Sequence, residues 1–400
     1  MKNWLWLGGV TLATLPALVM LFRPLEAAPA FGILFYGVAI LGAAFLLNWA
    51  AEVVQLDVSQ ALALAFLAII AVLPEYAVDV YFSWIAGKDI SYAPYAAANM
   101  TGANRLLIGI GWALVLFLFW VKGKEKTLEL KKSQSIELSF LLLATLYILT
   151  VPIKGALGIG LHLVDSMVLF TLFGLYIWVS LKADRVEPEL VGPSRAIASL
   201  STPLRRSVTV LIFLFSGLII VSVAKPFAEG LLATGKTLGI DEFILVQWIA
   251  PLASEAPELT IASLLVLRGA PRAGMGVLLS SKVNQWTLLV GTLPLVYAIS
   301  SGGVEGLPLD SRQVGEVMLT AAQSLLAIVI LAKLRFSSVG AAVLFTLFAT
   351  QLVFFGQAVR LGYAGLYLAL AVGLLLIRRG HLQALFQMVH YTLDQLRNRK

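Results

Sequence analysis

Long apolar runs separated by short polar breaks recur along the whole chain. Many runs approach the roughly 20 residues that an α-helix needs to cross the hydrocarbon core of a bilayer. The pattern predicts an all-α polytopic membrane protein with about twelve spans. The first run is longer than the roughly 7–15 apolar residues of a signal peptide and is interpreted as a helix. The expected spans are residues 4–22, 30–50, 58–86, 92–120, 136–152, 163–181, 206–224, 243–267, 271–298, 314–332, 338–357 and 361–378.

The longest polar break, at residues 183–205, divides the chain into two halves. We expect an N-terminal half at 1–182, a cytoplasmic linker at 183–205, a C-terminal half at 206–378 and an amphipathic cytoplasmic tail at 379–400. This tail helix either lies on the membrane surface or is solvated. Its helically spaced apolar residues are Leu382, Leu385, Phe386, Val389, Leu393 and Leu396.

Composition and charge agree with a membrane protein. Hydrophobic residues make up 60% of the chain and charged residues 13%, whereas soluble domains are roughly 45–50% apolar. With a cytoplasmic N-terminus, 20 of the 29 Lys and Arg residues fall in inside segments and 7 in outside segments. Basic residues orient membrane proteins in this way, so the net charge of +7 does not indicate nucleic-acid binding. We expect an integral protein of the cell membrane with both termini in the cytoplasm.

A proline followed by a glutamate interrupts one span in each half, at Pro74-Glu75 and at Pro257-Glu258. In each half a short connector follows, and the next span carries amide side chains. The two Pro-Glu spans are five spans apart, so they cross the membrane in opposite directions. Inverted repeats with broken helices are typical of secondary transporters. We place the repeats at about residues 58–120 and 243–298.

The chemistry of the Pro-Glu pairs indicates a cation site. Proline removes a backbone N–H and leaves a carbonyl oxygen of the preceding turn without its helical donor. A carboxylate at membrane depth costs at least about 2.5 kcal/mol, so it marks a functional site by default. Carboxylate, amide, hydroxyl and carbonyl oxygens suit hard cations such as Na⁺ and Ca²⁺. The chain has no cysteine, which excludes thiolate catalysis and cysteine-based metal sites.

The two segments resemble the α-repeats of the cation/calcium exchanger superfamily, which includes the sodium/calcium exchangers. The family motif runs G-[ST]-S-x-P-E and then G-N-x-x-G-S-N-x-x-[ND]. Residues 98–104, Ala-Asn-Met-Thr-Gly-Ala-Asn, are similar to its second part, and residues 276–282 are a weaker version. The resemblance implies secondary active antiport by alternating access at a midplane carboxylate site. It also implies Na⁺ or H⁺ as the coupling ion and Ca²⁺ as the cargo. We expect the helices at 30–50 and 206–224 to slide or rock past a four-helix core.

The resemblance also implies a set of ion ligands, with Glu75 and Glu258 at its centre. The first repeat departs from the motif because Ala71-Val72 replace two hydroxyl residues. The remaining implied ligands are Ser254, Glu255, Asn99, Asn104, Ser281, Asn284 and Gln285. Three further residues are expected to modulate the charge of the site, with the two basic ones acting as internal ion-pair partners: Asp79, Arg105 and Lys282. Glu316, near the start of a span, is expected at the membrane interface.

Two other functions stay open at this point. The basic residues Arg105 and Lys282 favour a Na⁺/H⁺ exchanger without Ca²⁺ transport. A non-transporting membrane scaffold or sensor would tolerate neutralisation of both Pro-Glu carboxylates. An enzyme is not expected, because the spans contain no plausible nucleophile or metal centre. The expected partners are the lipid bilayer and inorganic cations, without nucleic acid or a cofactor; the exchanged ions, their stoichiometry and the oligomeric state stay undetermined.

Overall fold

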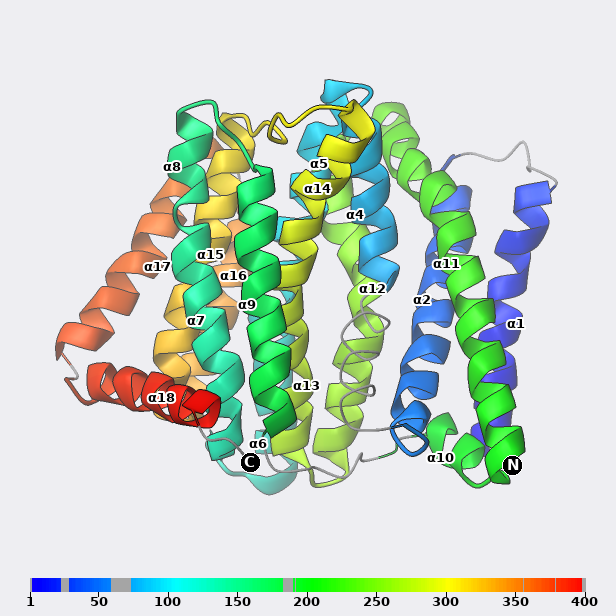
Figure 1. The fold of residues 1–400 in the computed structure, drawn as a ribbon, viewed down its shortest axis with the longest axis horizontal. Helices are drawn as coiled ribbons and strands as arrows, with labels where there is room; N and C mark the ends of the chain where they lie inside the picture. Colours follow the sequence, from blue (N-terminus) through cyan, green and yellow to red (C-terminus); the bar gives the residue numbers. More distant parts are fainter. Residues whose placement is uncertain are drawn as a thin grey trace. The chain divides into compact units, whose positions relative to one another are not determined.

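Helices dominate the computed structural model, which describes residues 2–22, 29–58, 73–182, 190, 192–354, 356–377 and 379–397 (Figure 1). Among these residues, nine helices are long and apolar enough to cross a membrane. The all-α polytopic fold is therefore confirmed. The three other predicted spans contain α4 (Leu73–Ala86), the pair α13 (Pro271–Asn284) and α14 (Val290–Ser301), and α16 (Ser338–Val353). Residues 59–72 of the third predicted span, which include Ala71 and Val72, lie outside the described residues.

The chain divides into two compact units. Unit 1 comprises residues 1–82 and 184–257, and unit 2 comprises residues 83–183 and 258–400. One boundary falls within α4, between Phe82 and Ser83, and another falls within α12 (Glu242–Leu267), between Pro257 and Glu258. Each helix that carries a Pro-Glu pair therefore contributes residues to both units.

Unit 1 is built around two long helices, α2 (Pro29–Val54) and α11 (Thr202–Leu238), which pack along each other. α1 (Lys2–Phe22) packs against α2, and the short α10 (Pro193–Ala198) contacts α2 and α11. α11 extends 14 residues beyond the predicted span end at 224, because the helix continues through Pro226 instead of ending there.

An ion pair joins the ends of α2 and α11 in unit 1. The two carboxylate oxygens of Asp57 accept hydrogen bonds from Arg205 at 2.6 and 2.7 Å, and Arg206 adds a contact at 3.2 Å. The hydrogen bonds from Arg205 lower the pKa of Asp57 below its ordinary value. This pair ties the turn after α2 to the first turn of α11, so it fixes how the two helices align.

Unit 2 contains the second helix of each predicted repeat, and each of these helices is interrupted by a π-helical segment. In the first, α5 (Ala93–Leu106) continues through the π-helical η2 (Leu107–Trp112) into α6 (Ala113–Gly123). In the second, α13 continues through the π-helical η4 (Gln285–Leu289) into α14. π-helical turns are rare and are frequently found at functional sites.

The helix α15 (Ser311–Leu331) forms the core of unit 2. Among the described apolar helices it is the most buried, and it packs against α5, α7 (Ser135–Ile148), α8 (Val151–Ala156) and α17 (Gln357–Ile377). The last helix, α18 (Arg379–Arg397), lies across the ends of α7 and α9 (Leu163–Lys182) (Figure 1). The remaining elements are the 3-10 turns η1 (Ile90–Tyr92) and η3 (Lys132–Gln134) and the antiparallel strands β1 (Thr127–Glu129) and β2 (Arg335–Ser337).

Candidate functional site

The Pro-Glu carboxylate of the first repeat is buried. Glu75 and Asp79 lie one turn apart on α4, and both side chains are almost completely shielded from solvent. Both belong to the part of α4 in unit 1. Residues four apart share one face of a helix, so the two acidic groups face the same side of α4. Such a pair of buried carboxylates has the oxygen chemistry that a hard cation requires.

The second repeat places three implied ligands on α12. Ser254, Glu255 and Glu258 are all buried. The prediction that Pro257 interrupts this helix is wrong, because α12 is helical from Glu242 to Leu267 with Pro251 and Pro257 inside it. A proline inside a transmembrane helix is tolerated where other groups satisfy the freed backbone. The Ser254 hydroxyl donates to the carbonyls of Ala250 and Pro251, at 3.3 and 3.4 Å.

In unit 2 the structure brings together two of the predicted residues, one from each repeat. The ammonium group of Lys282, on α13, donates to the side-chain oxygen of Asn104 at 2.6 Å and to its backbone oxygen at 3.0 Å. Lys282 is fully buried and also lies 4.5 Å from the ring centroid of Trp286. The side-chain nitrogen of Asn104 donates to Met100 O at 2.8 Å, which fixes the carboxamide orientation. The Lys282 ammonium thus binds the side-chain oxygen of Asn104, a residue expected from the sequence to be a cation ligand.

Four more implied ligands of unit 2 lie on the same two interrupted helices. Asn99 on α5 and Asn284 and Gln285 at the α13–η4 junction are buried. The Ser281 hydroxyl is also shielded, and it has no hydrogen-bond partner within the described part of the chain. A buried hydroxyl without a partner costs free energy unless another group binds it. Ser281 is therefore suited to coordinate an ion.

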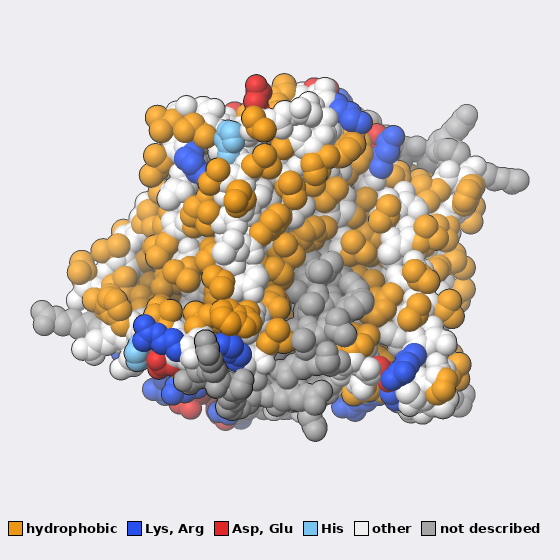
Figure 2. All heavy atoms as spheres, in the orientation of Figure 1, with side chains coloured by type: hydrophobic (Ala, Val, Ile, Leu, Met, Phe, Trp, Pro, Cys, Tyr) orange, Lys and Arg blue, Asp and Glu red, His pale blue; other side chains and the backbone are white. Residues whose placement is uncertain are grey.

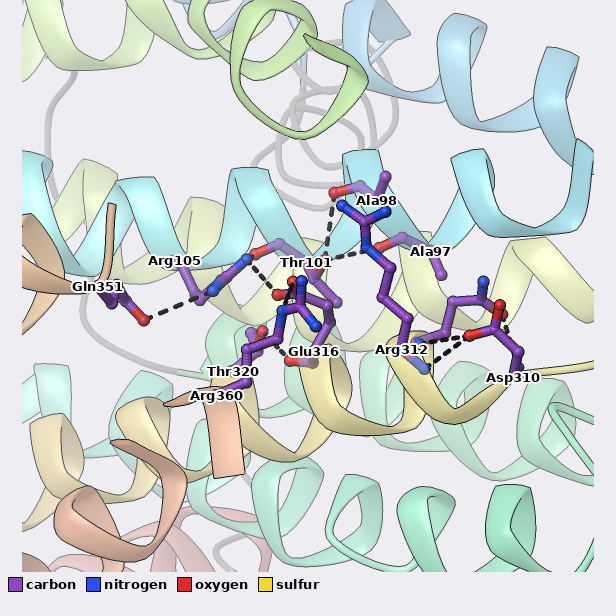
Figure 3. A network of polar contacts seen from close by, with 11 residues as sticks. Ala97, Ala98, Thr101, Arg105, Asp310, Arg312, Glu316, Thr320, Gln351 and Arg360 are labelled. Atoms are coloured by element: carbon purple, nitrogen blue, oxygen red, sulfur yellow. Dashed lines mark hydrogen bonds and ion pairs between the residues drawn. The ribbon is translucent and has the colours of Figure 1, made fainter. Parts of the chain in front are cut away.

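Arg105 belongs to a buried ion-pair cluster that the sequence did not predict (Figure 3). One oxygen of Glu316, on α15, lies 2.5 Å from Arg105 Nη2, and the other lies 2.7 Å from Arg360 Nε on α17. Arg105 also contacts the side-chain oxygen of Gln351, on α16, at 3.5 Å. The expectation that Arg105 is an internal ion-pair partner is confirmed. The Glu316 carboxylate is buried between two guanidinium groups, and its placement at the depth of the membrane interface stays a prediction.

Arg312 is a further basic residue close to this cluster. Its guanidinium points toward the α5 turn at Ala97 and Ala98, while Asp310 caps the start of α15 (Figure 3). The sequence does contain a signal for this cluster. Glu316 lies inside a predicted span, and a carboxylate within a span usually has a functional or structural partner. Its partner Arg360 could not be found this way, because the pairing depends on how α15 packs against α17.

Comparisons with known proteins give one family and several related structures. The sequence pattern of the family described as sodium/calcium exchanger protein matches residues 28–182 and 208–357. The crystal structure of an H⁺/Ca²⁺ exchanger, CAX, is 44% identical in sequence, covers 99% of both chains and superposes with a TM-score of 0.94. No curated protein sequence gives a significant match.

Two more distant structures share the fold alone. Native YfkE is 13% identical, with a TM-score of 0.65 over 87% of this chain and 98% of its own. The sodium-calcium exchanger NCX_Mj is 16% identical, with a TM-score of 0.53 over 82% of this chain and 99% of its own. The architecture of the chain therefore recurs in proteins of very different sequence.

Proposed function

Because the chain belongs to the sodium/calcium exchanger protein family, we propose that it is a secondary active antiporter that exchanges Ca²⁺ for H⁺ across the cell membrane, with both termini in the cytoplasm. The observation that carries this proposal is the 44% identity to an H⁺/Ca²⁺ exchanger over 99% of both chains. The chain is an integral membrane protein, given its family and its apolar helices. Its proposed partners are bilayer lipid and inorganic cations, and the proposed exchange involves no cofactor.

In this proposal the Pro-Glu carboxylates Glu75 and Glu258 bind the transported ion at the midplane of the membrane. Ca²⁺ takes six to eight oxygen ligands, and carboxylates supply the charge that compensates its dehydration. A carboxylate oxygen that holds a proton cannot at the same time coordinate a cation. Competition between protons and Ca²⁺ for the same buried oxygens is the simplest source of coupled exchange. The burial of both glutamates supports this role.

Lys282 favours H⁺ over Na⁺ as the coupling ion. Its ammonium already occupies the Asn104 carboxamide oxygen, so a Na⁺ ion would have to displace a tethered cation to use that ligand. Proton coupling needs no additional cation ligand, because a carboxylate alone carries the proton. A Na⁺/H⁺ exchanger without Ca²⁺ transport is the second candidate, because the fixed positive charge of Lys282 opposes binding of a divalent cation more than binding of a monovalent one.

Alternating access is proposed to involve α2 and α11 as one moving body. The two helices pack along each other within unit 1. The Asp57–Arg205 pair holds their ends together, so neither is expected to shift without the other. Transporters of this kind work by rocking or sliding one helical bundle around a fixed site.

The test is ion flux into vesicles that contain the purified full-length chain, with Ca²⁺, Na⁺ and proton gradients imposed one at a time. We expect a proton gradient to drive Ca²⁺ uphill and a Ca²⁺ gradient to drive protons in the opposite direction, without dependence on Na⁺. Proton-coupled Na⁺ flux without Ca²⁺ movement would establish the second candidate. If no gradient moved another ion, the chain would be a scaffold or sensor instead of an antiporter.

A further inference from the structure

The C-terminal helix α18 is fixed to unit 2 along one of its faces. The buried side chains on this face are Leu385, Met388 and Thr392. The Thr392 hydroxyl bonds to the Ser139 hydroxyl of α7 at 2.9 Å, and Ser139 donates to Met388 O at 3.2 Å. These contacts order the helix on α7, so its other faces have defined directions.

A second face of α18 is apolar and uncovered. Phe386 is 69% exposed, Leu382 is 46% exposed and Leu393 is 44% exposed. Positions 382, 386 and 393 lie on one face of the helix. Four residues make about one helical turn and seven residues make about two. Removing large apolar side chains from water is favourable in free energy, roughly in proportion to the apolar area covered. The uncovered stripe therefore favours an apolar neighbour from outside the chain.

The third face of α18 is polar, with Gln383, Gln387 and His390 exposed. His390 pairs with Asp394 one turn later, at 3.5 Å. An apolar stripe beside a polar stripe, with a third face packed on a transmembrane bundle, is the arrangement of a helix that lies in the plane of a membrane interface.

The position of α18 indicates which neighbour covers the apolar stripe. α18 lies across the ends of α7 and α9, just after α17, whose final residues Leu376 and Ile377 are largely exposed (Figure 1). The exposed apolar end of α17 and the apolar stripe of α18 are therefore close together in the chain. A bilayer can cover both, because the spanning helices already place unit 2 within it.

Basic and aromatic side chains surround α18 at this end of unit 2. Lys182 donates to Leu396 O at 2.9 Å and lies over the ring of Trp178. Lys132 lies over the ring of Tyr391, on α18 itself. Figure 2 shows Lys and Arg side chains gathered at this end, below the hydrophobic surface of the spanning helices. Basic residues at a membrane surface attract anionic headgroups, and aromatic rings anchor at the same level.

We propose that α18 binds the surface of the bilayer, with Leu382, Phe386 and Leu393 among the acyl chains and with Lys132 and Lys182 at anionic lipid headgroups. The polar face of α18 points to water. This surface is independent of the transport activity, since none of its residues belongs to the candidate ion site.

The absence of cysteine in the chain allows a direct test with single spin labels. Two matched pairs of neighbouring exposed residues are replaced in the full-length chain: Leu382→Cys with Gln383→Cys, and Phe386→Cys with Gln387→Cys. Each nitroxide-labelled variant is reconstituted in phosphatidylcholine vesicles with and without phosphatidylglycerol. Accessibility to oxygen, which partitions into lipid, is then compared with accessibility to a water-soluble nickel complex.

We expect the oxygen-to-nickel ratio to be severalfold higher at positions 382 and 386 than at positions 383 and 387. Phosphatidylglycerol is expected to raise the ratio at 386, and the double substitution Lys132→Gln with Lys182→Gln to cancel that rise. Equal aqueous ratios at all four positions would overturn the proposal, as would spin–spin broadening at 386 that reveals a second copy of the chain. A ratio at 386 that is unchanged by phosphatidylglycerol would overturn the assignment of anionic headgroups.

Discussion

Two buried basic residues, Arg105 and Lys282, have different surroundings. Arg105 is neutralised by Glu316, which it shares with Arg360. Lys282 donates to the side-chain and backbone oxygens of Asn104. The expected internal ion pair is confirmed for Arg105. The distinction could not come from the sequence, because it depends on which helix faces each side chain after packing.

Neutralising Glu316 is expected to destabilise unit 2 strongly. Glu316→Gln leaves two guanidinium groups in a buried cluster without their carboxylate, and breaking such a pair costs about 3–5 kcal/mol. Denaturant unfolding of the purified full-length chain measures this loss. The matched control is Glu129→Gln, whose pair with Arg335 is exposed and is expected to contribute less than about 1 kcal/mol. Equal effects of the two substitutions would mean that the cluster does not stabilise the fold.

Removing the positive charge of Lys282 is expected to strengthen Ca²⁺ binding. Lys282→Met keeps the length of the side chain but frees the Asn104 oxygen and removes a repulsive charge from among the implied ligands. We expect the dissociation constant for Ca²⁺ to fall about tenfold, which corresponds to about 1.4 kcal/mol. Isothermal titration of the purified protein measures this change, with the exposed Lys88→Met as the control. A weaker Ca²⁺ affinity in Lys282→Met would show that the ammonium holds Asn104 in its binding orientation.

The helices themselves could be predicted well, because the length of each apolar run sets the length of a span. Their irregularities could not. The π-helical segments η2 and η4 each lie within one predicted span, at residues 92–120 and 271–298, and hydropathy does not show the change in backbone hydrogen bonding. Pro257 was expected to interrupt α12, and the helix passes through it. Whether a proline breaks or only bends a helix depends on its neighbours, which one segment does not specify.

The segment η2 packs tightly on α16, and Gly109 lies at this contact. A Cβ atom added at Gly109 would overlap Cγ of Phe348. Overpacking of this kind costs about 1–3 kcal/mol, so Gly109→Ala is expected to lower the free energy of unfolding by that amount. The additional substitution Phe348→Ala is expected to relieve the clash, which a double-mutant cycle measures.

The control for this prediction is Gly174→Ala on α9, where an added Cβ meets no atom within 4 Å. This change is expected to be neutral or slightly stabilising, since alanine is favoured over glycine in a helix by roughly 1 kcal/mol. A Gly109→Ala protein as stable as Gly174→Ala would contradict the close packing of η2 on α16.

At the scale of the whole molecule, the membrane class, the helical spans and the family could be predicted from the sequence. The sequence could not predict which segments of the chain form each of the two compact units. Unit 1 combines residues 1–82 with residues 184–257, so each unit takes segments from both sides of the polar linker. Hydropathy shows where the chain leaves the membrane, but it does not show which helices then pack together. The division of the sequence into an N-terminal and a C-terminal half, each carrying one repeat, stays a prediction.

The Asp57–Arg205 pair of unit 1 predicts a dependence of stability on pH. The pKa of Asp57 is lowered in the folded protein relative to about 3.9 in an unfolded chain. Its stabilisation is therefore fully present above that unfolded value and is lost as the pH falls through the lower folded value. We expect the difference in melting temperature between the wild type and Asp57→Asn to shrink as the pH drops below about 4. A difference that persists in strong acid would show that Asp57 does not stabilise unit 1 through its charge.

Exchange of Ca²⁺ for H⁺ through the two Pro-Glu carboxylates is tested most directly by measuring proton movement driven by a Ca²⁺ gradient in vesicles. Wild type, Glu75→Gln, Glu258→Gln and the surface control Glu129→Gln are compared at equal amounts of folded protein. We predict exchange by the wild type and by Glu129→Gln, while Glu75→Gln and Glu258→Gln fall to the rate of protein-free vesicles. Exchange at the wild-type rate by Glu75→Gln and Glu258→Gln would show that the two Pro-Glu carboxylates do not carry the transported ions.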